Sequence, residues 1–535
     1  MSQYDDETEQ RRKMREKKAA KRRRQRRRAL IMRTVVFVLL LVILAVVVVY
    51  ARKMLDTGKK PSTASVSTSS TGTASEAAGG STAADASTVS TASVSELSVD
   101  TTSVTTTPKT KEEVLASAEL SGKMYDYDKG IATIQGFSGY DQDADLTEEI
   151  SKLTAQKSAC KAVDVGTTPH VFFHSLINDS RGLIVSSTCP EGRVKANNAA
   201  MTTVGEFDTM VNDMYQAGYV LISLDDLVTK TTNADGTVTY TKNTSLYLPS
   251  DKKPLIMSED DLSYYHSYGE NGAQGYADKL VIDSDGKVKC QYTDPSGNVQ
   301  IGDYDMVPRI DTFISEHPDF CYRGARPTIA LTGYNGIFGY RTNDYYKEGV
   351  DGADLNTAQK TWLKEHPEYN YDTDVAEATK IADALKADGW TFASHTYGHW
   401  NASQHSAEDL QKDNERWNAT VKICVGATDK IIFAFGGDIA GPEQYTADNP
   451  KYAYFLSQGF HIYANVDGTT FGWTQYGDNY VRDGRIALDG VTMYNAMTDS
   501  AQSHATYAND YSLLGIKDVA SFFDPNRTPE YCLSE

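Results

Sequence analysis

Two histidines four residues apart, His395 and His399, carry the clearest chemical signal in this chain. Neutral imidazole is the commonest protein ligand for borderline-soft metal ions, and one helical turn can present both rings to one point. The acidic run 259–261 lies about 135 residues earlier and can add a carboxylate. Three protein ligands leave positions open for water and a reactant, which is typical of a hydrolytic metal centre rather than a structural one. Zn²⁺ is the default ion for an Asp-His-His set, with Co²⁺, Ni²⁺ and Mn²⁺ as alternatives.

The elements that must position these residues are short apolar runs that alternate with amphipathic helices. Candidate strands lie at 170–174, 219–224, 255–257, 328–332, 390–393, 431–435 and 461–466. Apolar residues at helical spacing mark helices at 207–214, 375–385 and 407–424, the last with Ser406 as its N-cap. This alternation predicts one α/β domain, and we expect an irregular (β/α) barrel of about seven parallel strands.

Parallel barrels keep their active sites at the carboxyl ends of their strands, and the chemically active residues of this chain fall there. The acidic pair Asp260 and Asp261 follows one predicted strand, the two histidines follow another, and His174 closes a third. An acidic pair or a His-x-x-x-His spacing alone is commonly structural, but placement at three independent strand ends favours a single site. His174 is a candidate proton donor or substrate contact, and a structural role is the alternative.

Two short runs carry a family resemblance. Ser394-His395-Thr396-Tyr397-Gly398-His399 is similar to the pattern H-[S/T]-x-x-H, and Ser258-Glu259-Asp260-Asp261-Leu262 keeps the two aspartates of a T-F-D-D-G pattern. With these motifs, the segment from about residue 169 to residue 525 resembles the polysaccharide deacetylases of carbohydrate esterase family 4, the NodB-homology domain. The run 432–438 resembles the family's third motif without its usual arginine and proline.

The resemblance implies a division of labour. Asp260 would be the general base, and Asp261 would bind the metal beside His395 and His399. A divalent cation lowers the pKa of its bound water, and a carboxylate that does not ligate the cation can take the proton as the water attacks an acetamide. The oxyanion then needs a backbone donor as well as the metal, and the glycine pair 436–437 can supply it because glycine permits close approach.

The chain departs from the family pattern in three ways. Leu262 stands where the family has the glycine after the aspartate pair. The third-motif arginine that orients the base is absent, and we assign its role to Arg482, with Arg485 as the alternative. The late histidine that serves as general acid in the family has no obvious counterpart, because His504 lies in an unrelated context.

The first 53 residues differ sharply in charge from the rest. They hold 16 Lys/Arg and 5 Asp/Glu, a net charge of +11, so the remainder carries −30 of the whole-chain charge of −19. The 17 residues of 35–51 are uncharged and span about 25 Å as a helix, enough for a hydrocarbon core. We expect a basic cytoplasmic tail (1–33) and a transmembrane signal anchor (34–51) with the N-terminus inside. The alternatives are a cleaved signal peptide, which the poor cleavage site disfavours, and a nucleic-acid-binding patch, which the adjoining span disfavours.

The exported part divides by composition. Residues 52–110 are rich in Ser, Thr, Ala, Val and Gly and predict a disordered linker. Residues 111–165 predict a helical neck of two short helices, and 166–535 the catalytic domain, with a hairpin inserted at 280–303. The six cysteines permit up to three disulfides, of which we favour Cys290 with Cys321; free buried thiols are the alternative.

Together these features predict an enzyme of the cell membrane, held by a single span with its catalytic domain outside the cell. It would remove N-acetyl groups from a cell-surface amino-sugar polysaccharide, either peptidoglycan or an exopolysaccharide. Nucleic acid is not expected as a partner. Two alternatives stay open: an O-acetyl glycan esterase, and a catalytically degenerate glycan-binding protein of the cell envelope.

Overall fold

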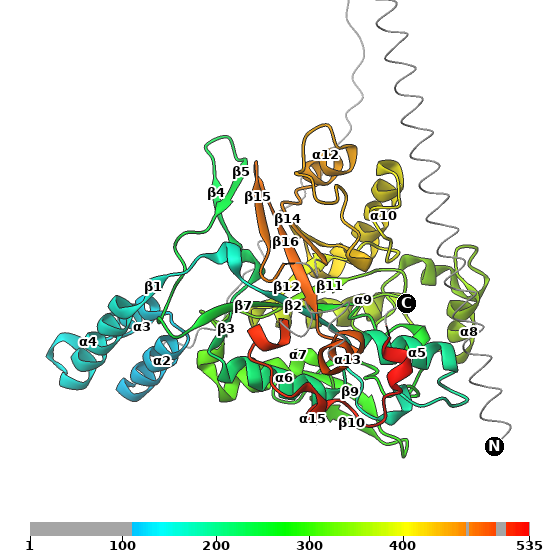
Figure 1. The fold of residues 1–535 in the computed structure, drawn as a ribbon, viewed down its shortest axis with the longest axis horizontal. Coiled ribbons are helices and arrows are strands. Elements are labelled where there is room, and N and C mark those ends of the chain that lie inside the picture. The colour runs from blue at the N-terminus through cyan, green and yellow to red at the C-terminus, as the bar shows by residue number, and fades with distance from the viewer. Residues whose placement is uncertain (1–109, 467–469, 499–509, 534–535) are drawn as a thin grey trace, which may run out of the picture. The chain divides into compact units, whose positions relative to one another are not determined.

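A closed ring of seven parallel strands forms the centre of the fold (Figure 1). Around the ring, the strands are β11 (Thr328–Leu331), β12 (Thr391–Ser394), β13 (Lys430–Ile432), β14 (Ile462–Val466), β16 (Tyr480–Ala487), β2 (His170–His174) and β7 (Lys253–Asp260). Pairing of β7 with β11 closes it. The predicted α/β barrel of parallel strands is therefore confirmed.

The computed structural model describes residues 110–466, 470–498 and 510–533. The predicted cytoplasmic tail, the anchor at 34–51, the linker up to residue 109 and His504 lie outside these ranges. Among the helices within them, none is both long and apolar enough to span a bilayer.

Six of the seven predicted strands belong to the ring. The strand predicted at 219–224 is the shorter β3 (Tyr219–Leu221), which pairs with β7 outside the ring. The seventh barrel strand is β16, which the sequence analysis does not predict. β15 (Thr474–Gly477) pairs antiparallel with β16.

Helices cover the outside of the ring. The predicted helices are confirmed as α6 (Val204–Gln216), α9 (Tyr371–Ala387) and α10 (Ala407–Thr420). Ser406 caps α10 in a capping box with Asp409, and α11 (Lys422–Val425) follows after a break. The other α-helices of the described barrel region are α5 (Glu191–Ala200), α7 (Met306–Glu316), α8 (Thr357–Glu365), α12 (Pro450–Ser457), α13 (Gly490–Thr498) and α15 (Val519–Phe522).

Side chains along each barrel strand alternate between the helix layer and the interior. Outward residues such as Phe173 and Met257 join the main hydrophobic core under the helices. Glu259 also faces outward, where burial and the charge of Asp305 raise its pKa well above the usual range. The interior instead contains a small cluster made of Ala330, Ala393, Ile432 and Ala464. These small side chains leave room inside the ring for polar groups.

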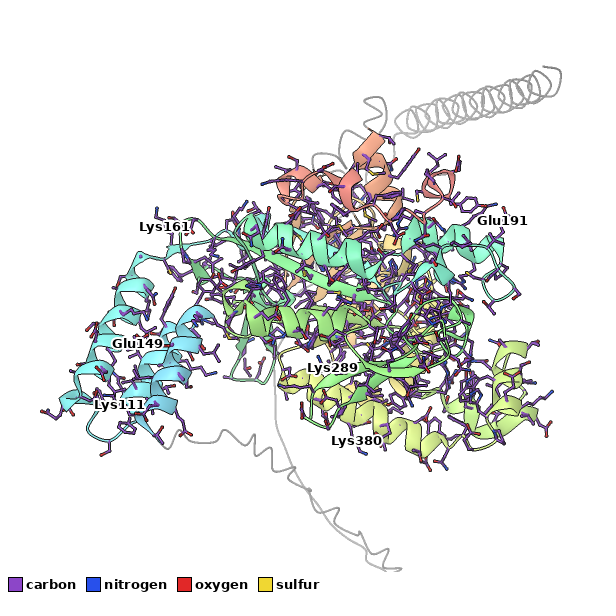
Figure 2. All side chains as sticks on the ribbon, turned by 90° about the horizontal axis from the view of Figure 1, so that it is seen from below. Lys111, Glu149, Lys161, Glu191, Lys289 and Lys380 are labelled. Carbon is purple, nitrogen blue, oxygen red and sulfur yellow. The ribbon has the colours of Figure 1, made fainter. Side chains whose placement is uncertain are left out.

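Three helices, rather than the two predicted, form the neck: α2 (Lys111–Lys123), α3 (Tyr127–Gln135) and α4 (Ala144–Ala159). Leu146 and Leu153 of the neck share a hydrophobic core with Ile256 and Val481 of the barrel. Figure 2 shows Lys111 and Glu149 on these helices, on the opposite side of the molecule from Glu191. The neck is therefore packed onto the barrel rather than separate from it.

Three small sheets complete the described chain. The predicted insertion is a three-stranded sheet of β8 (Lys279–Ile282), β9 (Val288–Thr293) and β10 (Val299–Gly302). The others pair β4 (Val228–Thr232) with β5 (Val238–Lys242), and β1 (Lys161–Ala162) with β6 (Tyr247–Leu248). All six cysteines are free thiols, so the favoured bridge between Cys290 and Cys321 is wrong.

Candidate metal centre

Asp261, His395 and His399 come together at the carboxyl end of the barrel. Their ligating atoms all lie within 4.8 Å of one another. His399 Nε2 lies 3.5 Å from Asp261 Oδ2, and His395 Nε2 lies 4.0 Å from Asp261 Oδ1. Ligands about 2.0 Å from a tetrahedral ion are about 3.3 Å apart, so a small contraction would place all three on one ion. Asp261 and His395 are buried, whereas the side chain of His399 is 26% exposed, which leaves the cluster open on one side.

The two histidines reach the cluster from a loop, not from the helical turn that their spacing predicts. Thr396 and His399 have φ values of 61° and 53°, in the left-handed region that few residues with side chains adopt. Asp413 on α10 accepts hydrogen bonds from the Tyr397 and Gly398 amides at 2.6 and 2.8 Å. The loop is thus fixed by a carboxylate beneath it, and nothing in the local sequence pattern identifies that carboxylate.

His395 is held in the form that binds metal. Its Nδ1 donates to the Ile432 carbonyl at 2.7 Å, which leaves the Nε2 lone pair facing Asp261. Burial lowers the pKa of His395, against the opposing effect of the neighbouring aspartates, and favours the neutral ring. The donor set therefore fits a divalent cation.

Asp261 is oriented by its backbone and by a tyrosine. Its φ is 64°, and its amide donates to the Ala330 carbonyl on β11 at 3.1 Å. The hydroxyl of Tyr265 donates to Asp261 Oδ1 at 2.6 Å and lies 2.5 Å from Thr332 Oγ1. This contact leaves Asp261 Oδ2 directed at His399. The sequence analysis does not identify Tyr265 as a site residue. The only signal in the sequence is its position four residues after Asp261.

Asp260 is clamped by an arginine. Arg485 Nη1 donates to Asp260 Oδ1 at 2.7 Å, and Nη2 donates to Oδ2 at 3.0 Å. Burial alone would raise the pKa of Asp260, but the Arg485 guanidinium outweighs it and holds that pKa well below its usual range. Asp260 Oδ2 lies 3.8 Å from His395 Nε2. A charged carboxylate with both oxygens engaged therefore stands beside the metal ligands.

The prediction that Arg482 orients Asp260 is wrong, because Arg485 makes that contact. Arg482 lies three residues before Arg485 on β16, so the alternation of side chains turns it away from the interior. It forms an ion pair with Asp438 at 3.0 Å and donates to the Glu443 carbonyl at 2.6 Å. It stabilises the loop after β13 and does not contact Asp260.

His174 lies on the same side of the barrel mouth as Asp260. The two residues are register partners on the neighbouring strands β2 and β7, so their side chains share the interior face. His174 also lies close to Asp489, which follows β16. His174 therefore lies at the same end of the barrel as Asp260. It comes from β2, whereas the metal ligands follow β7 and β12.

The loop after β13 lies beside the metal cluster, but its backbone differs from the predicted one. The strand predicted to reach residue 435 ends at Ile432 and is followed by a turn, in which Phe435 has a φ of 58°. The Gly436 and Gly437 amides donate to carbonyls within this turn, which corrects their predicted role as oxyanion donors. Phe435 is 69% exposed, and the centre of its ring lies 4.4 Å from that of the His399 ring. An exposed aromatic face therefore adjoins the metal cluster.

Comparison with known proteins gives one weak structural match. No family model matches the chain, and no curated protein matches it. One solved structure that is similar in part is a Streptococcus pyogenes deacetylase, PplD, in complex with acetate. The two chains are 12% identical with a TM-score of 0.28, and the match covers 60% of this chain and 92% of that one. A likeness this weak identifies neither family nor activity.

Proposed function

We propose that the protein is a divalent-metal-dependent hydrolase that removes N-acetyl groups from an amino-sugar polysaccharide. The observation that carries the proposal is the Asp261, His395 and His399 cluster with a second, arginine-clamped carboxylate, Asp260, beside it. A site that only binds metal has no need of a buried carboxylate kept charged at this position. A hydrolytic site needs one to take a proton from water.

Each residue then has a distinct task. Asp261, His395 and His399 would hold the cation, which when bound activates water and polarises the acetamide carbonyl. Asp260 takes the proton of the attacking water, and Arg485 keeps Asp260 ionised and fixed. His174, on the strand beside Asp260, donates a proton to the leaving amine. The exposed Phe435 face offers a surface on which a sugar ring can pack.

The proposal also covers the identity of the metal ion and the cellular location of the protein. Zn²⁺ is the ion we propose, because a neutral imidazole pair with one carboxylate suits it, and Co²⁺, Ni²⁺ and Mn²⁺ are the competitors. We propose that residues 34–51 anchor the chain with its barrel outside the cell, where peptidoglycan or an exopolysaccharide is the substrate. Protease treatment of intact cells tests this topology: the barrel should be digested and the amino-terminal tail protected.

The activity is tested on the full-length protein by acetate release from N-acetylated chito-oligomers and peptidoglycan, with and without chelator. We expect chelator-sensitive release that is lost in His395→Ala and Asp260→Asn. His405→Ala is the matched control, because His405 stacks on Trp400 and is outside the metal cluster. Release from an O-acetylated glycan alone would indicate the esterase, and bound metal with no release from any of these glycans would indicate the glycan-binding alternative.

A further inference from the structure

A column of polar side chains continues from Asp260 down the inside of the barrel. Arg485 Nη1, which contacts Asp260, lies 3.2 Å from Ser258 Oγ. Ser258 Oγ lies 2.9 Å from His170 Nε2, and His170 Nδ1 lies 2.5 Å from Asp483 Oδ2. All five residues are at most 2% exposed. The interior of a parallel barrel is ordinarily filled by branched apolar side chains, so this column requires an explanation.

Burial lowers the pKa of His170 and favours the neutral ring. With His170 neutral, the hydrogen bonds of the column can run in only one direction. At one end a guanidinium only donates, and at the other end the Asp483 carboxylate only accepts. His170 must therefore carry its proton on Nδ1 and accept at Nε2. Ser258 then donates to His170 and accepts from Arg485. Each group has a single orientation, so the column has no alternative arrangement of its protons.

The strand registers explain why Arg485 needs such support. Arg485 is the register partner of His170, at the amino end of β2, whereas Asp260 is the register partner of His174, at the carboxyl end. The arginine side chain must therefore extend along the interior to reach Asp260. The guanidinium packs 4.1 Å above the Phe172 ring, and Ser258 is the hydroxyl that holds Nη1 from below.

We propose that Asp483, His170 and Ser258 are positioning residues that act through Arg485 to set where the Asp260 carboxylate stands at the metal centre. The inference rests on the proposed role of Asp260 as the base. The Thr474 hydroxyl, 3.2 Å from Asp483 Oδ1, extends the same network to β15. Polar chains of this kind reinforce one another in a dry interior, so loss of one link loosens the whole chain.

Ser258→Ala tests the proposal because it removes one hydroxyl from the middle of the column. Displacement of the base by a fraction of an ångström should lower kcat about tenfold, while KM and the metal Kd stay unchanged. Thr328→Val is the matched control. Thr328 is the β11 register partner of Ser258, so it faces the same interior layer, but its hydroxyl contacts Thr391 instead of the column. It should keep wild-type kcat.

The coupling between the links gives a second readout. His170→Phe should lower kcat by a similar factor, and the double variant with Ser258→Ala should lose no more than either single variant, because both break the same chain. Full additivity, an equal loss in Thr328→Val, or a wild-type kcat in Ser258→Ala would each overturn the positioning role.

Nitrogen-15 NMR of the histidines separates this inference from the proposed function. Wild-type protein should show His170 protonated at Nδ1 only, and the opposite tautomer would overturn the direction of the column. If that tautomer is found but the wild type hydrolyses no acetylated glycan, the proposed function fails and the column is purely structural. If the wild type turns over and Ser258→Ala matches it, only the positioning role fails.

Discussion

Replacing Arg485 with methionine should change the ionisation of Asp260 while keeping an unbranched side chain in the barrel interior. The guanidinium holds both Asp260 oxygens, at 2.7 and 3.0 Å, which places the two charges about 4 Å apart. At an effective dielectric constant of about 20, such a pair interacts by about 4 kcal/mol. At 1.36 kcal/mol per unit, this corresponds to a rise of about three units in the pKa of Asp260. The acid limb of kcat/KM should move upward by up to about that amount.

Arg482→Met is an internal control for this variant. Arg482 lies on the same strand, is likewise 1% exposed and also pairs with an aspartate, but it faces away from the site. Loss of a buried partner should cost each variant about 3–5 kcal/mol of unfolding free energy. Only Arg485→Met should shift the pH profile. The measurements are kcat/KM for acetate release against pH and urea unfolding of each variant.

The result that refutes this reasoning is a folded, metal-binding Arg485→Met protein with the acid limb of the wild type. Asp260 would then not be the base, or its ionisation would not depend on the arginine. An equal shift in Arg482→Met would also refute it, because that change leaves the Asp260 clamp intact.

Three further outcomes follow from other contacts. Tyr265→Phe removes the hydroxyl that orients Asp261 and should weaken metal binding about 10- to 100-fold in competition with a chromophoric chelator; an unchanged Kd would contradict this role. Arg527→Met leaves the fully buried Glu206 unpaired and should cost about 3–5 kcal/mol in urea unfolding, whereas a loss below about 1 kcal/mol would show that the ion pair contributes little. Burial lowers the pKa of His266 from 6.5 to about 4, so the stability from its neutral ring is complete above pH 6.5 and lost as the pH falls through about 4. About 2 kcal/mol should be gone by about pH 5, and His266→Gln should unfold with a flatter pH dependence.

The metal ligands could be predicted from sequence because their signal is local and chemical. His395 and His399 are four residues apart, and Asp261 follows an apolar run that is recognisable as a strand. The backbone geometry that unites them could not be predicted. It depends on left-handed residues and on Asp413, which supports the loop from a helix 14 residues beyond His399, an interval that forms no recognisable motif.

The missing strand β16 has a physical cause. Its interior-facing residues include Asp483 and Arg485, so the run 480–487 lacks the apolar character by which the other barrel strands were recognised. The partners that make these charges tolerable inside a barrel are remote in the chain. Asp260 lies 225 residues from Arg485, and His170 lies 313 residues from Asp483. The local sequence pattern carries no information about charge partners that are so far apart in the chain.

The choice between the two arginines follows from that strand once it is known. Arg482 is the register partner of Tyr463, which is in the outer core with Tyr445, whereas Asp483 is the partner of the interior Ala464. Period-two alternation then sends Arg485 inward with Asp483 and Arg482 outward. Charged residues two apart on an otherwise buried strand are costly unless each meets a partner. A run of this kind in a predicted parallel barrel therefore points to an interior polar site, and here it leads from β16 to the carboxylate beside the metal ligands.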